Sequence, residues 1–202
     1  MNLFSELTDP TINILPRDGI VNYFGPLLPL NEATDYYKKL MSTIAWKNDE
    51  VILYGKRIIT KREVAWYGDR DFSYTYSNIS RPALPWTKEL LELKVLVEKK
   101  LNESFNSCLL NLYHSGEEGM SWHSDDEKEL VPHGSIASLS FGAERKFSFK
   151  HKQTKQEVEQ VLEHGSLLVM KAKTQIHWLH SLRKTKKVRE PRINLTFRKF
   201  VE

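Results

Sequence analysis

The sequence predicts an α+β fold that is mainly β, in which two helices precede a body of short antiparallel strands. Segments 31–44 and 85–105 repeat apolar residues at helical spacing. After Ser107, short β-rich runs follow one another, separated by polar or glycine-containing joints. The length of 202 residues suggests one domain, with a helical N-terminal part (1–106) ahead of a β-rich core (107–202).

Proline and glycine punctuation predicts irregular or short-strand structure up to about Pro29. We expect the first helix to use Asn31 as its N-cap. Residues 51–79 are expected to form strands and loops, including a hairpin that turns at Gly55, before the second helix at 85–105. The strand candidates that follow are CLLNLY, SIASLSF, KFSFK, VEQVL, SLLVMK, IHWLH and INLTF.

Composition excludes several classes of protein. Hydrophobic residues make up 40% and charged residues 28%, so the signature of a disordered chain is absent. A single cysteine, Cys108, excludes an internal disulfide, a four-cysteine zinc site and a thioredoxin-type pair. No apolar run approaches the ~20 residues of a membrane helix, and the acidic N-terminus does not resemble a secretory signal. We expect no membrane partner, and we also expect a monomer. The short, undecorated chain suggests a bacterial cytoplasmic protein, or a nuclear one if the source is eukaryotic.

The last strand candidate, 192–198, alternates without a break, so its apolar and polar residues occupy opposite faces. On a surface strand the polar face would simply meet water. In a closed β body it would line a cavity, where two guanidinium groups need anions because unpaired buried charge is costly. A dicarboxylate would supply those anions. Asn111 and Tyr113 have the same two-residue spacing and would add an amide and a phenol to this wall.

His123 and Asp125 are also two residues apart, and on a strand they would point at one spot. His180 lies in the apolar run IHWLH, where His177 is a competing candidate. Two histidines and one carboxylate form the facial triad, which binds Fe(II) and leaves coordination positions open. H-x-D alone is a weak pattern, and a surface turn is the alternative.

Taken in order, these pieces resemble the AlkB family of Fe(II)/2-oxoglutarate-dependent dioxygenases. The matching segments are NLY at 111–113, HSDDE at 123–127, WLHSL at 178–182 and RINLTFR at 192–198. The resemblance spans roughly 51–200 and is greatest to the duplex-active DNA-repair branch, which has similar YGK and YGD…YTYS stretches. It implies a double-stranded β-helix (jelly-roll) core, N-terminal helices and a nucleotide-recognition lid.

The resemblance also implies roles for individual residues. His123, Asp125 and His180 would bind Fe(II), with His180 favoured over His177 because Ser-Leu follows it. Arg198 would pair with the distal carboxylate of 2-oxoglutarate, and Arg192 would lie nearer the iron. The full set implied to bind 2-oxoglutarate is Asn111, Tyr113, Arg192, Asn194, Thr196 and Arg198.

The implied reaction is oxidative dealkylation of DNA bases such as 1-methyladenine and 3-methylcytosine. It would release formaldehyde while 2-oxoglutarate and O₂ become succinate and CO₂. The base must leave the stack, and Tyr54 matches the family's aromatic finger. Basic residues of 57–62 and 183–189 are expected on both sides of the cavity mouth, where they would attract phosphate. The implied substrate-binding set is Tyr54, Gly55, Lys56, Tyr74, Thr75, Tyr76, Asp126 and Glu127.

Two alternatives stay open at this point. The same oxygenase chemistry could act on RNA or on a protein side chain, and a non-catalytic β-barrel binding module is a different class. The tyrosines could be half-buried packing residues, since aromatic residues favour strands, and a basic run is often only a solvated face.

Overall fold

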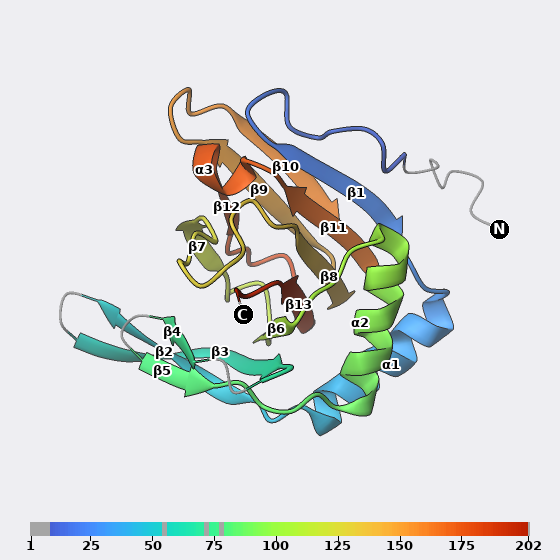
Figure 1. Cartoon of the computed structure of the whole chain (residues 1–202). Helices are drawn as coiled ribbons and strands as arrows, with labels where there is room; N and C mark the ends of the chain where they lie inside the picture. Colours follow the sequence, from blue (N-terminus) through green and yellow to red (C-terminus); the bar gives the residue numbers. More distant parts are fainter. Residues whose placement is uncertain (1–8, 54–55, 71–72, 77–78, 202) are drawn as a thin grey trace.

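Two antiparallel sheets form the body of the protein, as the computed structural model in Figure 1 shows. The structure describes residues 9–53, 56–70, 73–76 and 79–201, without the side chains of 51–56, 73–76 and 79–81. The larger sheet has seven strands, in the order β1 (Ile20–Pro26), β11 (Ser166–Lys171), β8 (Ile136–Gly142), β13 (Arg192–Arg198), β6 (Ser107–Tyr113), β3 (Lys56–Gly68) and β2 (Lys47–Leu53). The smaller has four, in the order β10 (Glu157–Leu162), β9 (Arg145–His151), β12 (Trp178–Leu182) and β7 (Met120–His123).

The two sheets pack against each other through apolar side chains. Ile136 and Leu168 of the larger sheet share a buried cluster with Phe149 and Trp178 of the smaller one. This arrangement confirms the mainly β fold and the expected jelly roll. The larger sheet combines strands from both parts of the chain expected from the sequence. β1, β2 and β3 come from residues 1–106, and the other four strands come from residues 107–202.

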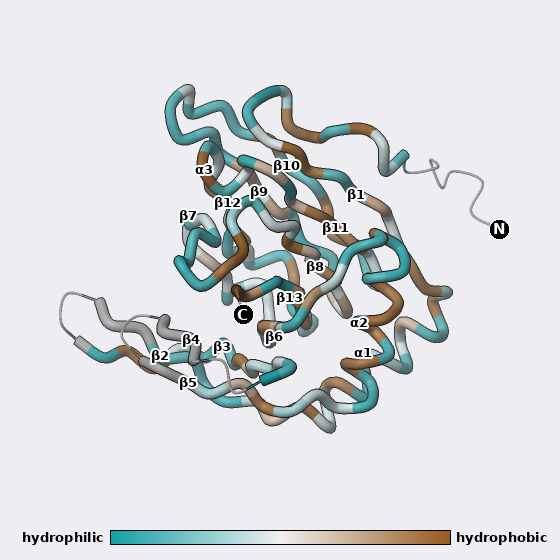
Figure 2. Tube along the Cα trace, in the orientation of Figure 1, coloured by the Kyte–Doolittle hydropathy of each residue, from teal (hydrophilic) through white to brown (hydrophobic). Residues whose placement is uncertain are grey.

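Two helices, α1 (Leu30–Thr43) and α2 (Lys88–Leu101), cover the outer face of the larger sheet (Figure 1). Ile193, Leu195 and Phe197 of β13 are fully buried there, in one cluster with Leu40 of α1 and Leu93 of α2. Figure 2 shows hydrophobic stretches along these helices and the central strands, whereas the outer loops are hydrophilic. The apolar face of β13 therefore packs against the two helices, and its polar face points toward the smaller sheet.

The helix boundaries differ from the sequence-based expectation. The prediction of Asn31 as N-cap is wrong, because the carbonyl of Pro29 already accepts the amide of Ala33 and α1 begins at Leu30. The second helix is shorter than 85–105. Thr87 caps its N-terminus by accepting the amide of Leu90, and Asn102 ends it in the left-handed conformation.

A third helix, α3 (Thr174–His177), spans only four residues and leads into β12. Within the described ranges, no helix is long and apolar enough to cross a membrane.

An arm of strands extends from the edge of the larger sheet (Figure 1). β2 and β3 pair antiparallel as far as Leu53 and Lys56, as expected for a hairpin. Beside them β4 (Ser73–Tyr76) pairs with β5 (Ile79–Pro82). Tyr54 and Gly55 lie outside the described residues, as do the side chains of Lys56, Tyr74, Thr75 and Tyr76.

Candidate metal centre and cavity

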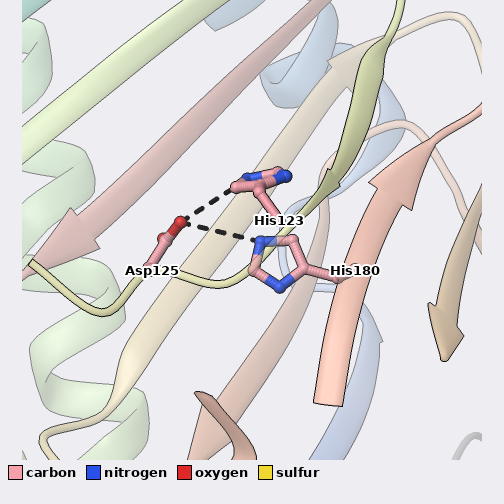
Figure 3. Close-up of side chains that lie close together, drawn as sticks. All are labelled: His123, Asp125 and His180. Atoms are coloured by element: carbon pink, nitrogen blue, oxygen red, sulfur yellow. Dashed lines mark ion pairs between the residues drawn. The ribbon is translucent and has the colours of Figure 1, made fainter. Parts of the chain in front are cut away.

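His123, Asp125 and His180 converge on one point between the two sheets (Figure 3). β7 and β12 pair with His123 directly opposite His180, and their ring centroids are 4.2 Å apart. One oxygen of Asp125, Oδ1, lies 3.5 Å from Nε2 of His123 and 3.6 Å from Nε2 of His180. The competing His177 lies at the end of α3 and stacks on His151 instead.

The hydrogen bonding of His123 and the pKa shifts of His123 and Asp125 suit metal binding. Nδ1 of His123 donates a hydrogen bond to the carbonyl of Ser121 (2.8 Å), which leaves Nε2 available as a ligand. Burial and the neighbouring His180 lower the pKa of His123 to about 4. Burial alone would raise the pKa of Asp125, but Arg198 and the two histidines outweigh it and hold that pKa well below its usual range. Two imidazoles and one ionised carboxylate are the donor set that fits Fe(II).

The loop that carries Asp125 is tied to α3, an element the sequence analysis missed. The backbone amide of Asp125 donates to Oε1 of Gln175 (2.9 Å). Nζ of Lys152 donates both to Oγ of Ser124 (3.0 Å) and to the carbonyl of Gln175 (2.8 Å). These contacts set the position of the carboxylate relative to the histidines.

The polar face of β13 forms a hydrogen-bonded wall beside the triad. Nη2 of Arg192 donates to Oγ of Ser140 (2.9 Å) and to Oδ1 of Asn194 (2.8 Å). Nδ2 of Asn194 in turn donates to Oγ1 of Thr196 (2.9 Å). Asn111, opposite Asn194 in the sheet, is buried with Oδ1 lacking any partner in the described part of the chain.

Arg192 is a cation that needs an anion. Its side chain is 3% exposed, Nε has no hydrogen-bond partner, and no carboxylate pairs with it among the described residues. Burial lowers the pKa of Arg192 to about 10, so the group stays charged at neutral pH. Its guanidinium lies 5.7 Å from the ring centre of Tyr113. A carboxylate of a bound dicarboxylate fits this environment.

The structure reverses the expected order of the two arginines. Nη1 of Arg198 lies 3.7 Å from Oδ2 of Asp125 and 3.0 Å from Oε1 of Glu127, at the metal end of the wall. Arg192 begins the same strand, about 20 Å away along the backbone, and lies against Tyr113 instead. Alternation along a strand predicts which residues share a face, but not which end of the strand meets the triad.

A cavity of about 740 Å³ lies beside the triad. Its wall includes Asn111, Glu127 and Arg198 from the core and residues of β2 and β3 from the arm. Glu127 therefore lines this cavity, and its contact with a base stays a prediction. Asp126 is absent from this wall and lines a second cavity of about 470 Å³, as Asp125 and Glu127 also do, so its contact with a base stays a prediction.

The basic residues also differ from expectation. Arg57 and Arg62 of the arm line the larger cavity, but the loop 183–189 does not. Arg183 instead pairs with Glu157 and lies over the ring of Trp122 at 5.0 Å. Among the described residues, the basic side chains of the larger cavity are therefore Lys47, Arg57 and Arg62 of the arm and Arg198 of the core.

Comparison with known proteins decides the family. A family model described as the 2OG-Fe(II) oxygenase superfamily matches residues 20–198. The chain belongs to this superfamily. It is 38% identical over 203 residues to human DNA oxidative demethylase ALKBH2, covering 95% of this chain and 78% of that protein. It is 41% identical over 179 residues to bovine alpha-ketoglutarate-dependent dioxygenase alkB homolog 3, covering 84% of this chain and 62% of that protein.

These relatives confirm the resemblance to the AlkB family and the expected Fe(II)/2-oxoglutarate-dependent dioxygenase. The triad suits Fe(II), and the hydrogen-bonded wall of β13 suits 2-oxoglutarate. Their identities are similar, so they do not single out one branch of the family. A solved structure, that of OsALKBH1, superposes with a TM-score of 0.59 at 16% identity, over 92% of this chain and 99% of that one. This last likeness concerns the fold alone.

Proposed function

We propose that this dioxygenase removes alkyl groups from ring nitrogens of nucleic acid bases, with DNA as the preferred substrate. The observation that carries the proposal is the 740 Å³ cavity between the triad and the arm. Its volume falls in the usual range of small-molecule sites, ~300–1,000 Å³. Relatives named DNA oxidative demethylase support the choice of substrate.

In this proposal His123, Asp125 and His180 hold Fe(II), and Arg198 keeps Asp125 ionised. Fe(II) bound there, together with 2-oxoglutarate and O₂, supplies the oxidant for the alkyl carbon. Arg192 binds the distal carboxylate of 2-oxoglutarate and so orients the co-substrate along the wall. Residues further along the wall, Asn111, Tyr113, Asn194, Thr196 and Arg198, complete this binding site.

The atoms of the reaction balance without a protein nucleophile. One oxygen atom of O₂ enters the alkyl C–H bond and the other enters succinate, while CO₂ leaves. The hydroxymethyl group on the base nitrogen then breaks its C–N bond, which returns the N–H or unprotonated base and releases formaldehyde. The task of the protein is therefore positioning and the exclusion of side reactions.

The base must lie outside the duplex to reach this cavity. We propose that Tyr54, Gly55 and Lys56 act at the tip of the hairpin between β2 and β3, and that Tyr74, Thr75 and Tyr76 of β4 hold the extruded base. Glu127 lines the cavity, which supports our proposal that it contacts that base.

The test uses the iron-loaded protein with oligonucleotides that carry one 1-methyladenine or 3-methylcytosine. Single-stranded DNA, duplex DNA and RNA of the same sequence are compared by mass spectrometry and by formaldehyde release. We expect loss of the methyl group from DNA, faster than from RNA. Faster conversion of RNA would reverse the substrate preference, and no conversion of any strand would refute the proposal.

A further inference from the structure

A buried ion pair in the cavity wall includes Asp49, a residue with no part in the roles described above. Arg62 of β3 and Asp49 of β2 are each 6% exposed, and both line the 740 Å³ cavity. Nη2 of Arg62 donates to Oδ2 of Asp49. Its Nη1 lies 3.1 Å from the sulfur of Met120, the first residue of β7, which ends at His123. The pair therefore stands beside the metal centre.

An irregularity in the hairpin turns this arginine inward. Asn48 pairs with Glu63 and Glu50 pairs with Ile59, so residues 60–62 of β3 lie opposite the single residue Asp49. Nδ2 of Asn48 donates to the carbonyl of Thr60 (3.1 Å), which holds the extra residues in place. Such bulges re-aim side chains, often next to active sites.

The pair leaves hydrogen-bonding capacity unused. Nε of Arg62 is buried without a partner. The hydrogen bond from Nη2 of Arg62 reaches Oδ2 of Asp49 and not its second oxygen, Oδ1. A buried ion pair that serves only stability satisfies its remaining donors and acceptors, because each one left over is costly. Because Asp49 lines the cavity and Arg62 binds its Oδ2, Oδ1 is the oxygen that can meet a molecule there.

We propose that Asp49 is a specificity-determining residue that admits bases carrying a positive charge. Adenine alkylated at N1 and cytosine alkylated at N3 are cations at neutral pH, whereas guanine alkylated at N1 and thymine alkylated at N3 are neutral. Asp49 neutralises Arg62, which would otherwise repel a cationic ring, and offers its second oxygen to that ring. This inference rests on the proposed function.

The charge of each partner can be removed separately, and the two changes have opposite effects. Asp49→Asn leaves Arg62 as an uncompensated cation in the wall, so activity on cationic lesions falls while activity on neutral lesions holds. Arg62→Gln leaves Asp49 as an uncompensated anion, so the preference for cationic lesions rises. We expect each variant to shift the cationic-to-neutral ratio of kcat/KM by about tenfold, which corresponds to ~1.4 kcal/mol.

The experiment compares matched oligonucleotides containing 1-methyladenine, 3-methylcytosine, 1-methylguanine or 3-methylthymine. It measures kcat/KM and, without oxygen, the affinity of the protein for each strand by fluorescence anisotropy. Glu159→Gln is the matched control, because this carboxylate of β10 also pairs with a cation, Lys146, but at an exposed site that does not line the cavity. Glu159→Gln should leave the cationic-to-neutral ratio of kcat/KM unchanged, and likewise the cationic-to-neutral ratio of affinities.

Equal losses on cationic and neutral lesions in Asp49→Asn, or a shift of the same sign in both variants, would overturn the role of Asp49. Inactivity of the wild-type protein on all four lesions refutes the proposed function instead. If Asp49→Asn does not fold, the ratio measured for Arg62→Gln decides, and a ratio equal to that of the wild-type protein overturns the inference.

Discussion

Asp125 lies between two histidines and an arginine, and these neighbours determine its charge. Its carboxylate is within 3.7 Å of the nearest nitrogen of His123, His180 and Arg198. Because Arg198 holds the pKa of Asp125 low against the effect of burial, the carboxylate is ionised before a metal arrives. The site thus needs no loss of a carboxyl proton when Fe(II) binds.

The first prediction concerns this carboxylate. Asp125→Ala removes one of three iron ligands, so turnover should be abolished. The fold should persist, because Arg198 keeps its hydrogen bond to Glu127. Fe(II) at 100 times its dissociation constant should stabilise the wild-type protein by ~2.7 kcal/mol, and thermal unfolding should show no such gain in the variant. An insoluble variant would show that Asp125 is structural.

Arg192 permits a second prediction, because its charge is buried without a carboxylate partner among the described residues. Arg192→Met should leave the free energy of unfolding of the unliganded protein nearly unchanged or raise it. The KM for 2-oxoglutarate should rise by about 10- to 100-fold, since a hydrogen bond to a charged group is worth ~1.5–3 kcal/mol. Steady-state kinetics measure this change, and an unaltered KM would show that the distal carboxylate binds elsewhere.

For single residues, the sequence predicts which side chains share a face of a strand better than it predicts which of them lies nearest the metal site. The alternation of 192–198 correctly predicted the shared face of that strand, and His123 and Asp125 do meet at one site. The reason expected for that pair was wrong, because β7 ends at His123 and Asp125 lies in the loop that follows. The order of Arg192 and Arg198 was wrong, because pattern carries no information about which strand end meets the triad. Asp49 was missed, since only the bulge in β3 brings Arg62 to it.

Helix α3 is short, but it positions the metal-binding loop through Gln175. Gln175→Ala removes the acceptor for the amide of Asp125, a hydrogen bond worth about 1 kcal/mol. We expect Fe(II) affinity to fall about fivefold, with partial recovery in Gln175→Glu, which retains an acceptor oxygen. Titration of the protein with Fe(II) measures the effect. Equal affinity in wild-type and Ala proteins would show that α3 does not position the loop.

The hairpin between β2 and β3 carries the prediction for Tyr54, which lies outside the described residues. If this residue fills the gap left by the extruded base, Tyr54→Ala should harm activity on duplex DNA more than on single strands. The comparison uses one methylated strand with and without its complement. Equal losses on both substrates would exclude the finger role.

Helices and strands were predictable where the periodic spacing of apolar residues continued over a long, uninterrupted segment. Both longer helices were expected, but their ends depend on backbone details, such as the carbonyl of Pro29 and the left-handed Asn102. A four-residue helix such as α3 has too few residues to show a period. Most strand candidates after residue 107 correspond to strands of the two sheets, because alternation and β-branched residues mark them. The candidate IHWLH is wrong in its first two residues, which belong to α3, and the four-residue strand β7 was missed.

Sequence patterns did not predict which strands pair across the whole molecule. β1 pairs with β11 and β3 with β6, contacts between segments far apart in the chain, so nothing local predicts them. These pairings extend the larger sheet beyond the core expected from residue 107 onward. They also carry the arm to the triad, and the cavity between them exists only in the assembled molecule.

The central claim is that His123, Asp125 and His180 hold Fe(II) beside a wall that binds 2-oxoglutarate. The most direct test is an anaerobic titration of the Fe(II)-loaded protein with 2-oxoglutarate, followed by visible absorption. A metal-to-ligand charge-transfer band should appear and saturate at one equivalent, and it should be absent in His180→Ala. A folded wild-type protein that shows no band, or a band that persists in His180→Ala, would contradict the claim.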